Sequence, residues 1–220
     1  MNRPTLIAWT LTLGFGAVSC KVLSAQDNSL EIMGGSAFNI PTPLTIYQQG
    51  YPDIKTTAHY DTKPFGPDAP YYAWRYSRWN TDTSWEFSQI HHRLFLSNPP
   101  DSVQYFAIHY GYNYFLVGRG WKLANFKVHF GADPVVTYPN ISVRYMVSPS
   151  GGGLFNTGYY ISGVGVAGSI EKRVHLWRSV CLAMEVGVTA ADAWDVPIAD
   201  GHAQVPNLAV HGRLGIDFDF

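Results

Sequence analysis

The chain ends in residues 207–220, NLAVHGRLGIDFDF, in which two kinds of side chain alternate without a break. One set is apolar or glycine: Leu208, Val210, Gly212, Leu214, Ile216, Phe218 and Phe220. The other set is largely polar: Asn207, Ala209, His211, Arg213, Gly215, Asp217 and Asp219. A period of two is that of a β-strand, whose successive side chains point to opposite faces. The sequence therefore predicts a strand with one apolar and one polar face that runs to the last residue.

The composition indicates the environment of the two faces of such a strand. Of the 220 residues 46% are hydrophobic, 15% aromatic and only 14% charged, against about 25% charged in ordinary soluble domains. The formal charge is -1, with 15 Lys and Arg against 16 Asp and Glu, so no basic surface exists to bind nucleic acid. Beyond the N-terminus no apolar run reaches the roughly 18 residues that a transmembrane helix needs. An aromatic-rich, charge-poor chain with alternating strands is typical of a transmembrane β-barrel.

Residues 212–220 (GRLGIDFDF) resemble the final strand of Gram-negative outer-membrane barrels, which ends in an aromatic residue. The resemblance implies that the protein is exported through the periplasm and resides in the bacterial outer membrane. It also implies contact with outer-membrane lipids and lipopolysaccharide. Phe218 and Phe220 would then form the signal that the outer-membrane insertion machinery reads.

The N-terminus agrees with export. Arg3 precedes an apolar stretch, residues 6–18, and small and polar residues follow through Ala25; this order predicts a signal peptide over 1–25 and a barrel over 26–220. Cleavage before Cys20 is the alternative, and it would make Cys20 a lipidation site. The one remaining thiol, Cys181, cannot form an intramolecular disulfide, and we interpret it as a packing residue.

Alternation and turn residues predict eight antiparallel strands, an even number as in bacterial single-chain barrels. The predicted strands are 29–40, 70–79, 83–96, 103–117, 121–133, 158–170, 174–190 and 206–220. Short periplasmic turns are expected at 80–82, 118–120 and 171–173, and long external loops at 41–69, 137–158 and 191–206. Residues 53–62 would form an extension above the membrane; if they span it instead, the count becomes ten.

Four tryptophans near the short turns predict an aromatic belt at the periplasmic interface: Trp79, Trp85, Trp121 and Trp177. Trp121 and Trp177 have the parity of the inner face in this scheme, so a bulge or a turn is required beside them. In 103–117, the scheme turns one row toward lipid: Phe106, Ile108, Tyr110, Tyr112, Tyr114 and Leu116.

The inner faces predict a lumen plugged by a polar network, because side chains just fill an eight-stranded barrel. Its expected members are Glu86, His92, His109, Asn113, Lys127, His129, Asp133, Glu185, His211, Arg213, Asp217 and Asp219. Acids and bases nearly balance in this set, as buried charges require.

Three functions remain open, and the first, a structural or surface-interaction role with external loops for recognition, is preferred. The second is a lipid A or phospholipid acyl hydrolase, for which Glu86, His92 and His109 are the catalytic candidates. Ser88 lies four residues from His92, roughly 13 Å along a strand, which is too far for a nucleophile and base. The third is a narrow solute or ion passage.

Two remaining expectations concern ligands. The barrel histidines and Asp133 could meet as a metal site, but each comes from a different strand and no local ligand motif is present, so neither a metal nor a cofactor is predicted. His91 and Arg93, on the outer face near the external rim, suit lipopolysaccharide phosphates better than catalysis. The oligomeric state stays open.

Overall fold

The structure is a computed structural model that describes residues 27–65 and 70–220. The predicted signal peptide and Cys20 lie outside these residues. Among the described residues, no helix is long and apolar enough to cross a membrane.

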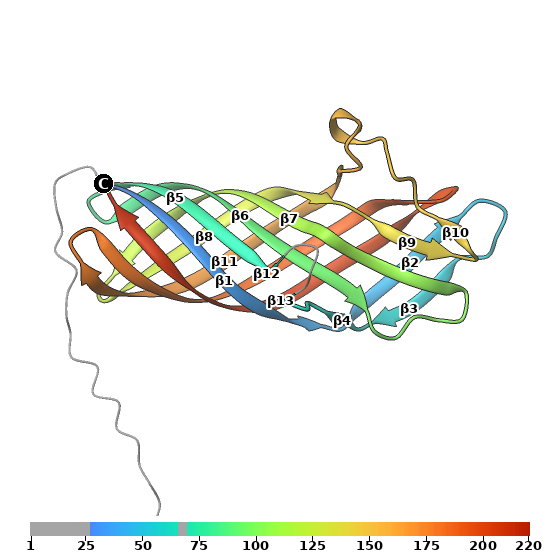
Figure 1. Ribbon diagram of the computed structural model, residues 1–220, viewed down its shortest axis with the longest axis horizontal. Coiled ribbons are helices and arrows are strands. Elements are labelled where there is room, and N and C mark those ends of the chain that lie inside the picture. The colour runs from blue at the N-terminus through green and yellow to red at the C-terminus, as the bar shows by residue number, and fades with distance from the viewer. Residues whose placement is uncertain (1–26, 66–69) are drawn as a thin grey trace, which may run out of the picture.

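Eight strands form a closed antiparallel ring (Figure 1). In order around the ring they are β1 (Asp27–Ile40), β5 (Tyr72–Asn80), β6 (Thr83–Leu96), β7 (Val103–Leu123), β8 (Phe126–Thr137), β11 (Tyr160–Trp177), β12 (Val180–Ile198) and β13 (Gly201–Asp219). The last strand pairs with the first from Ser29 opposite Asp219 to Ile40 opposite Leu208, which closes the barrel. The predicted eight-stranded antiparallel barrel is confirmed.

Short turns join the strands at the end that carries the C-terminus (Figure 1). The turn after Asn80 is where the sequence predicted it, but the other two were placed wrongly, at 118–120 and 171–173. The chain instead turns at residues 124–125 and 178–179. Gly118 and Gly120 lie within β7. A Cβ at Gly118 would come within 2.3 Å of Phe130 O, and a Cβ at Gly120 would come within 2.3 Å of Glu86 Oε1. These glycines make room inside and beside the barrel wall, and they do not bend the chain.

The opposite end extends far beyond a membrane. β12 and β13 have 19 residues each, where a transmembrane strand needs about 9–11. Only residues 199–200 separate them, so the predicted long loop at 191–206 is wrong. The two strands continue upward because Ala193, Val196, Ala203 and Val205 remain buried on their inner faces.

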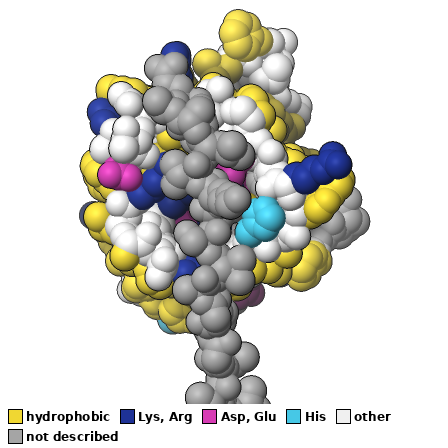
Figure 2. All heavy atoms as spheres, turned by 90° about the vertical axis from the view of Figure 1, so that its left-hand side faces the viewer, with side chains coloured by type: hydrophobic (Ala, Val, Ile, Leu, Met, Phe, Trp, Pro, Cys, Tyr) yellow, Lys and Arg dark blue, Asp and Glu magenta, His cyan; other side chains and the backbone are white. Residues whose placement is uncertain are grey.

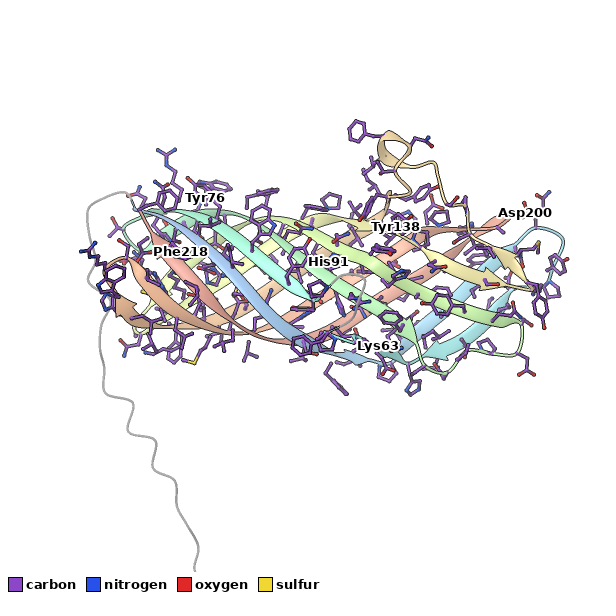
Figure 3. The ribbon with its side chains drawn as sticks, in the orientation of Figure 1. Lys63, Tyr76, His91, Tyr138, Asp200 and Phe218 are labelled. Carbon is purple, nitrogen blue, oxygen red and sulfur yellow. The ribbon has the colours of Figure 1, made fainter. Side chains whose placement is uncertain are left out.

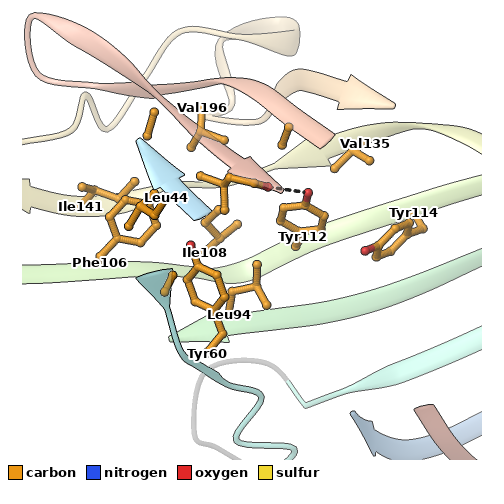
Figure 4. Packing of buried hydrophobic residues seen from close by; sticks show 14 of the residues in the cluster. Leu44, Tyr60, Leu94, Phe106, Ile108, Tyr112, Tyr114, Val135, Ile141 and Val196 are labelled. Carbon is orange, nitrogen blue, oxygen red and sulfur yellow. Dashed lines mark hydrogen bonds between the residues drawn. The ribbon is translucent and has the colours of Figure 1, made fainter. Parts of the chain in front are cut away.

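Five shorter strands complete this extension: β2 (Thr42–Gln48), β3 (Ile54–Ala58), β4 (Tyr60–Asp61), β9 (Asn140–Val143) and β10 (Met146–Val147). β2 pairs with β13 and with β3, β4 with β6, and β9 with β7 and β10. The expectation that residues 53–62 form an extension rather than a ring strand is confirmed. The extension encloses an apolar core that includes Leu44, Leu94, Ile108, Ile141 and Val196 (Figure 4).

The face of β7 is the largest error of the sequence prediction. Phe106, Ile108, Tyr112, Tyr114 and Leu116 point into the barrel and are at most 5% exposed. The hydroxyl of Tyr112 donates a hydrogen bond of 2.9 Å across the lumen to the carbonyl of Val205. Large rings fill an interior of this width, so alternation identified two faces but not which one is inside. Only Tyr110, beside the bulge at Gly111, contacts the outer wall.

The outer surface of the ring is apolar. Exposed side chains from five strands include Ile32, Phe130, Val164, Val186 and Leu214. Seen from the C-terminal end, hydrophobic side chains gather around the periphery (Figure 2). Every ring strand pairs with a neighbour on both sides, although β1 pairs with β5 only from Asp27 to Gly34; hydrogen bonding of both strand edges is the requirement for spanning lipid. The fold is therefore that of a transmembrane β-barrel.

The aromatic belt at the short-turn end contains three of the four predicted tryptophans. Trp85 and Trp177 are 63% exposed and Trp121 is 36% exposed. The bulge expected at Trp177 is present between His175 and Trp177, whereas Trp121 faces outward because the faces of β7 are exchanged. Trp79 does not join the belt: it lies inside, with Nε1 3.4 Å from Ser29 Oγ.

Candidate functional site in the filled lumen

A buried arginine organises the lumen near the short-turn end. The guanidinium of Arg75, on β5, donates to Glu31 at 2.6 Å, to Glu171 at 3.1 Å and to Glu185. Glu86 lies 3.8 Å away. These carboxylates come from four different strands, so one cation holds together opposite sides of the barrel.

A second cation, Lys127 on β8, shares two of the same carboxylates. Its Nζ lies 3.4 Å from Glu31, 3.7 Å from Glu171 and 3.3 Å from Asp217. Arg173 contacts the same Asp217 carboxylate at 2.6 Å. Buried charges are tolerated only when they are paired and hydrogen-bonded, and this arrangement gives each carboxylate at least one cation.

His129 and Arg213 complete the layer, which we name the ion-pair layer. Nδ1 of His129 lies 2.9 Å from the Glu86 carboxylate, and Arg213 Nη2 lies 2.6 Å from Glu185 Oε1. The layer consists of Glu31, Arg75, Glu86, Lys127, His129, Glu171, Arg173, Glu185, Arg213 and Asp217.

Four of these residues are absent from the predicted network: Glu31, Arg75, Glu171 and Arg173. The alternation in residues 72–80 (YAWRYSRWN) carried the signal for Arg75, since Ala73, Ser77 and Trp79 share its parity. Glu171 and Arg173 were missed because their segment had been assigned to a turn.

Above the ion-pair layer lies a layer of neutral hydrogen bonds. Nδ1 of His211 is 2.8 Å from the hydroxyl of Tyr71, and its Nε2 is 2.8 Å from the hydroxyl of Thr189. His92 Nε2 is 3.3 Å from the hydroxyl of Thr62, and the rings of His92 and His211 meet edge to face at 5.1 Å.

Two asparagines and a tyrosine extend this neutral layer across the barrel. Asn207 Nδ2 donates to Asn39 Oδ1 at 2.9 Å, and Tyr114 donates its hydroxyl to Asn207 Oδ1 at 3.3 Å. Asp133 also faces the lumen, where a Cβ on Gly165 would come within 2.7 Å of its Oδ1.

Two residues of the predicted network lie on the outer wall, which corrects the prediction. Asn113 Oδ1 is 2.8 Å from Nδ1 of His91, and the His91 ring stacks on Tyr72 at 4.8 Å. The His109 ring packs on Phe95 at 6.1 Å. The reason is the exchanged face of β7 together with its register: Glu86 is opposite Gly118 rather than Asn113. Two extra residues of β7 at its bulge shift the pairing.

The catalytic candidates are therefore separated. Glu86 belongs to the ion-pair layer, His92 to the neutral layer and His109 to the outer wall. The hydroxyls next to Glu86 are those of Ser77 and Ser84, at 3.1 and 2.7 Å, and both bind the carboxylate. The structure thus does not join the three candidates into one nucleophile, base and acid.

The expected meeting of histidines is also incomplete. His92 and His211 are in contact, whereas His129 lies in the ion-pair layer and His109 outside. Two buried sets of groups do approach within 4.8 Å of one another: His129, Glu171 and Glu185, and Glu31, Glu171 and Asp217. Arg75 and Lys127 already supply the positive charge to these carboxylates.

One cavity inside the lumen is small. A cavity of about 20 Å³ lies beside the ion-pair layer, lined by Ala73, Ser88, Gly131, Ala167 and Ser169 among others. That volume holds about one water molecule. From the short-turn end upward, the interior contains paired charges, then hydrogen bonds among uncharged side chains and histidines, then apolar packing.

Comparison with known proteins gives likenesses of fold. No protein-family model matches the chain, and no curated protein matches it. The solid-state NMR structure of outer membrane protein AlkL in DMPC bilayers is 12% identical, with 92% of this chain and 93% of that chain covered at a TM-score of 0.47. Ail, the attachment invasion locus protein of Yersinia pestis, is 9% identical, with 90% and 100% covered at 0.42.

Neisserial surface protein A is 10% identical, and the similarity covers 90% of this chain and 98% of that chain at a TM-score of 0.36. The assignment as a closed eight-stranded barrel rests on the strand pairings of this chain itself.

Proposed function

We propose that the protein is an outer-membrane barrel with a structural or surface-interaction role, whose lumen is closed and whose extension presents the recognition surface. The ion-pair layer carries this proposal. Because Arg75 and Lys127 connect carboxylates from opposite sides of the barrel, a solute can pass only if several buried pairs separate. The apolar core above would oppose a hydrated solute as well.

Conductance tests the closed lumen. The refolded protein is inserted into planar bilayers, and its heat-modifiable migration on a detergent gel first establishes that the barrel has formed. We expect no steady open level. A stable single-channel conductance from the heat-modifiable form would overturn the proposal and support the narrow passage.

The hydrolase alternative is tested by mass spectrometry of lipid A. Cells that produce the protein, its His92→Ala variant or its His109→Ala variant are expected to have identical lipid A profiles, because the two side chains lie in different compartments. Loss of an acyl chain that depends on either histidine would establish an enzyme and refute the structural role.

The C-terminal strand is proposed to be the part read by the insertion machinery. Phe218 and Phe220 are 42% and 69% exposed on the outer face at the short-turn end. The two exposed rings beside the β13–β1 seam support this proposal, because a partner strand could recognise them there before closure.

Lipopolysaccharide is the proposed lipid partner at the opposite interface. Lys63 Nζ and Arg93 Cζ lie 4.5 and 4.9 Å from the centre of the Phe95 ring on the outer wall. Arg93 is buried and Lys63 is exposed; Asp61 is opposite Phe95 in the pairing of β4 with β6. A lipopolysaccharide-dependent rise in melting temperature should shrink in Lys63→Ala, whereas an unchanged rise would exclude this contact.

A further inference from the structure

One loop leaves the barrel sideways instead of continuing toward the extracellular tip. It follows β10, carries the short 3-10 helix η1 (Leu154–Asn156) and returns to β11 (Figure 1). Phe155, in η1, is 96% exposed, and its neighbour Leu154 is 36% exposed. A large hydrophobic ring thus projects from the side of the molecule.

The loop is held in place by its own hydrogen bonds. Leu154 N donates to Tyr159 O at 2.6 Å, and Gly158 N donates to Gly152 O at 3.0 Å. Gly152 N donates to Asn156 Oδ1 at 2.8 Å. Phe155 and Asn156 both adopt left-handed backbone angles, with φ of 51° and 58°, and residues other than glycine rarely adopt such angles. The exposed ring is therefore a defined feature of an ordered loop.

The base of the loop rests on a group of tyrosines on the outer wall. The ring of Tyr138 lies 5.2 Å from that of Tyr110 and 5.0 Å from that of Tyr159, and the Tyr159 hydroxyl donates to Tyr110 O at 3.3 Å. Along the barrel, Tyr138 lies between Phe218 and Asp200 (Figure 3).

Strand geometry gives the height of these tyrosines. Phe126 begins β8 at the short-turn end and Tyr138 follows its last residue. Twelve steps of about 3.3 Å, tilted by about 40°, rise about 30 Å. An outer-membrane barrel has an apolar band of about 25 Å between aromatic girdles, so the tyrosines lie at the level of the second girdle.

The composition of the loop fits the same level. Residues 148–159 read SPSGGGLFNTGY and contain no charged side chain. The tips farther out do carry charge, including Asp53, Lys55, Asp101 and Asp200. An uncharged loop with one aromatic and one aliphatic side chain suits the interface between headgroups and acyl chains.

We propose that Leu154 and Phe155 insert into the outer leaflet beside the barrel, so that this loop is a lateral membrane anchor. The partner is a lipid surface, and the inference rests on the proposed membrane location. The anchor would limit rotation and tilt of the barrel, because it extends the lipid contact to one side only.

Site-directed spin labelling tests the anchor. A single cysteine is introduced by Phe155→Cys in the full chain carrying Cys20→Ser, and the folded protein is reconstituted into phosphatidylcholine vesicles. The buried Cys181 stays unlabelled. Two labels in the same background serve as controls: Tyr145→Cys, a residue 85% exposed at the extracellular end, and Val188→Cys, 46% exposed within the apolar band.

At residue 155 we expect oxygen to broaden the signal several-fold more than a water-soluble nickel complex does. The lipid-facing control at residue 188 should show the same order, and the water-exposed control at residue 145 should show the reverse order. Water-like accessibility at 155 with lipid-like accessibility at 188 overturns the anchor alone. Water-like accessibility at both positions refutes the membrane location. Immobilisation at 155 that disappears on dilution with unlabelled protein would show contact with a second copy and likewise overturn the anchor.

Discussion

Replacement of Arg75 by methionine tests the ion-pair layer most directly. The variant removes the cation that contacts Glu31, Glu171 and Glu185 and retains a side chain of similar length. Glu185 keeps Arg213 at 2.6 Å, and Glu171 keeps His129 at 3.4 Å, but Glu31 and Glu171 must then share the one remaining lysine, Lys127, at 3.4 and 3.7 Å.

The magnitude follows from this redistribution. Removing one member of a buried pair destabilises a protein by about 3–5 kcal/mol because the remaining charge is uncompensated. Lys127 already serves Asp217 as well and cannot neutralise the excess. We therefore expect the free energy of unfolding of Arg75→Met to fall by about 3 kcal/mol or more.

Reversible urea unfolding of the refolded protein, followed by tryptophan fluorescence and by gel mobility, measures this change. Arg78→Met is the matched control, since Arg78 lies three residues away on the exposed side of the same strand and such surface changes stay within about 0.5 kcal/mol. Glu31→Gln added to Arg75→Met should recover part of the loss, because it removes one uncompensated carboxylate. A loss equal to that of Arg78→Met, or no recovery in the double variant, would refute the ion-pair reasoning.

Three further outcomes follow from the structure. Tyr112→Phe should lower the free energy of unfolding by about 0.5–1.5 kcal/mol, as for one buried hydrogen bond; no change in a urea titration would favour the lipid-facing orientation. Gly118→Ala should fail to give a heat-modifiable barrel, since its Cβ would lie 2.3 Å from the backbone oxygen of Phe130, whereas Gly212→Ala, with nothing within 4 Å, should fold normally; equal folding would contradict the packing. Phe220→Ala should slow assembly by the insertion machinery in isolated outer membranes without changing the stability of the refolded protein, and an unchanged assembly rate would remove its role as a signal.

The fold was largely predictable from local pattern. The alternation in residues 207–220 identified β13 and assigned its inner face, with His211, Arg213 and Asp217 buried. The row from Val180 to Val188 on β12 is likewise outward. In these two stretches, 180–189 and 207–220, the polar side chains stand on one face only, so the choice of the inner face needs no information from other strands.

For β7 the local pattern does not predict which face points into the lumen. Both of its faces carry rings and small polar residues, so the pattern is consistent with either orientation. The orientation is decided by lumen volume and by the register between β6 and β7, in which Glu86 is opposite Gly118 and His92 is opposite Tyr112. The two extra residues of the bulge leave the parity of β7 unchanged, because a shift of two keeps each side chain on its face. His109 and Asn113 were assigned to the wrong side for this reason.

The sequence by itself determined that the chain forms strands of period two, that one face of most strands is apolar and that an even number of them can close. Only the tertiary structure decided which charges meet. Arg75 and Glu171 are 96 residues apart, and their contact depends on the stagger of the ring, on where β7 and β11 turn and on the bulges. Alternation is a property of neighbouring residues and is visible in the sequence, whereas register and lumen filling arise from closure of the whole barrel.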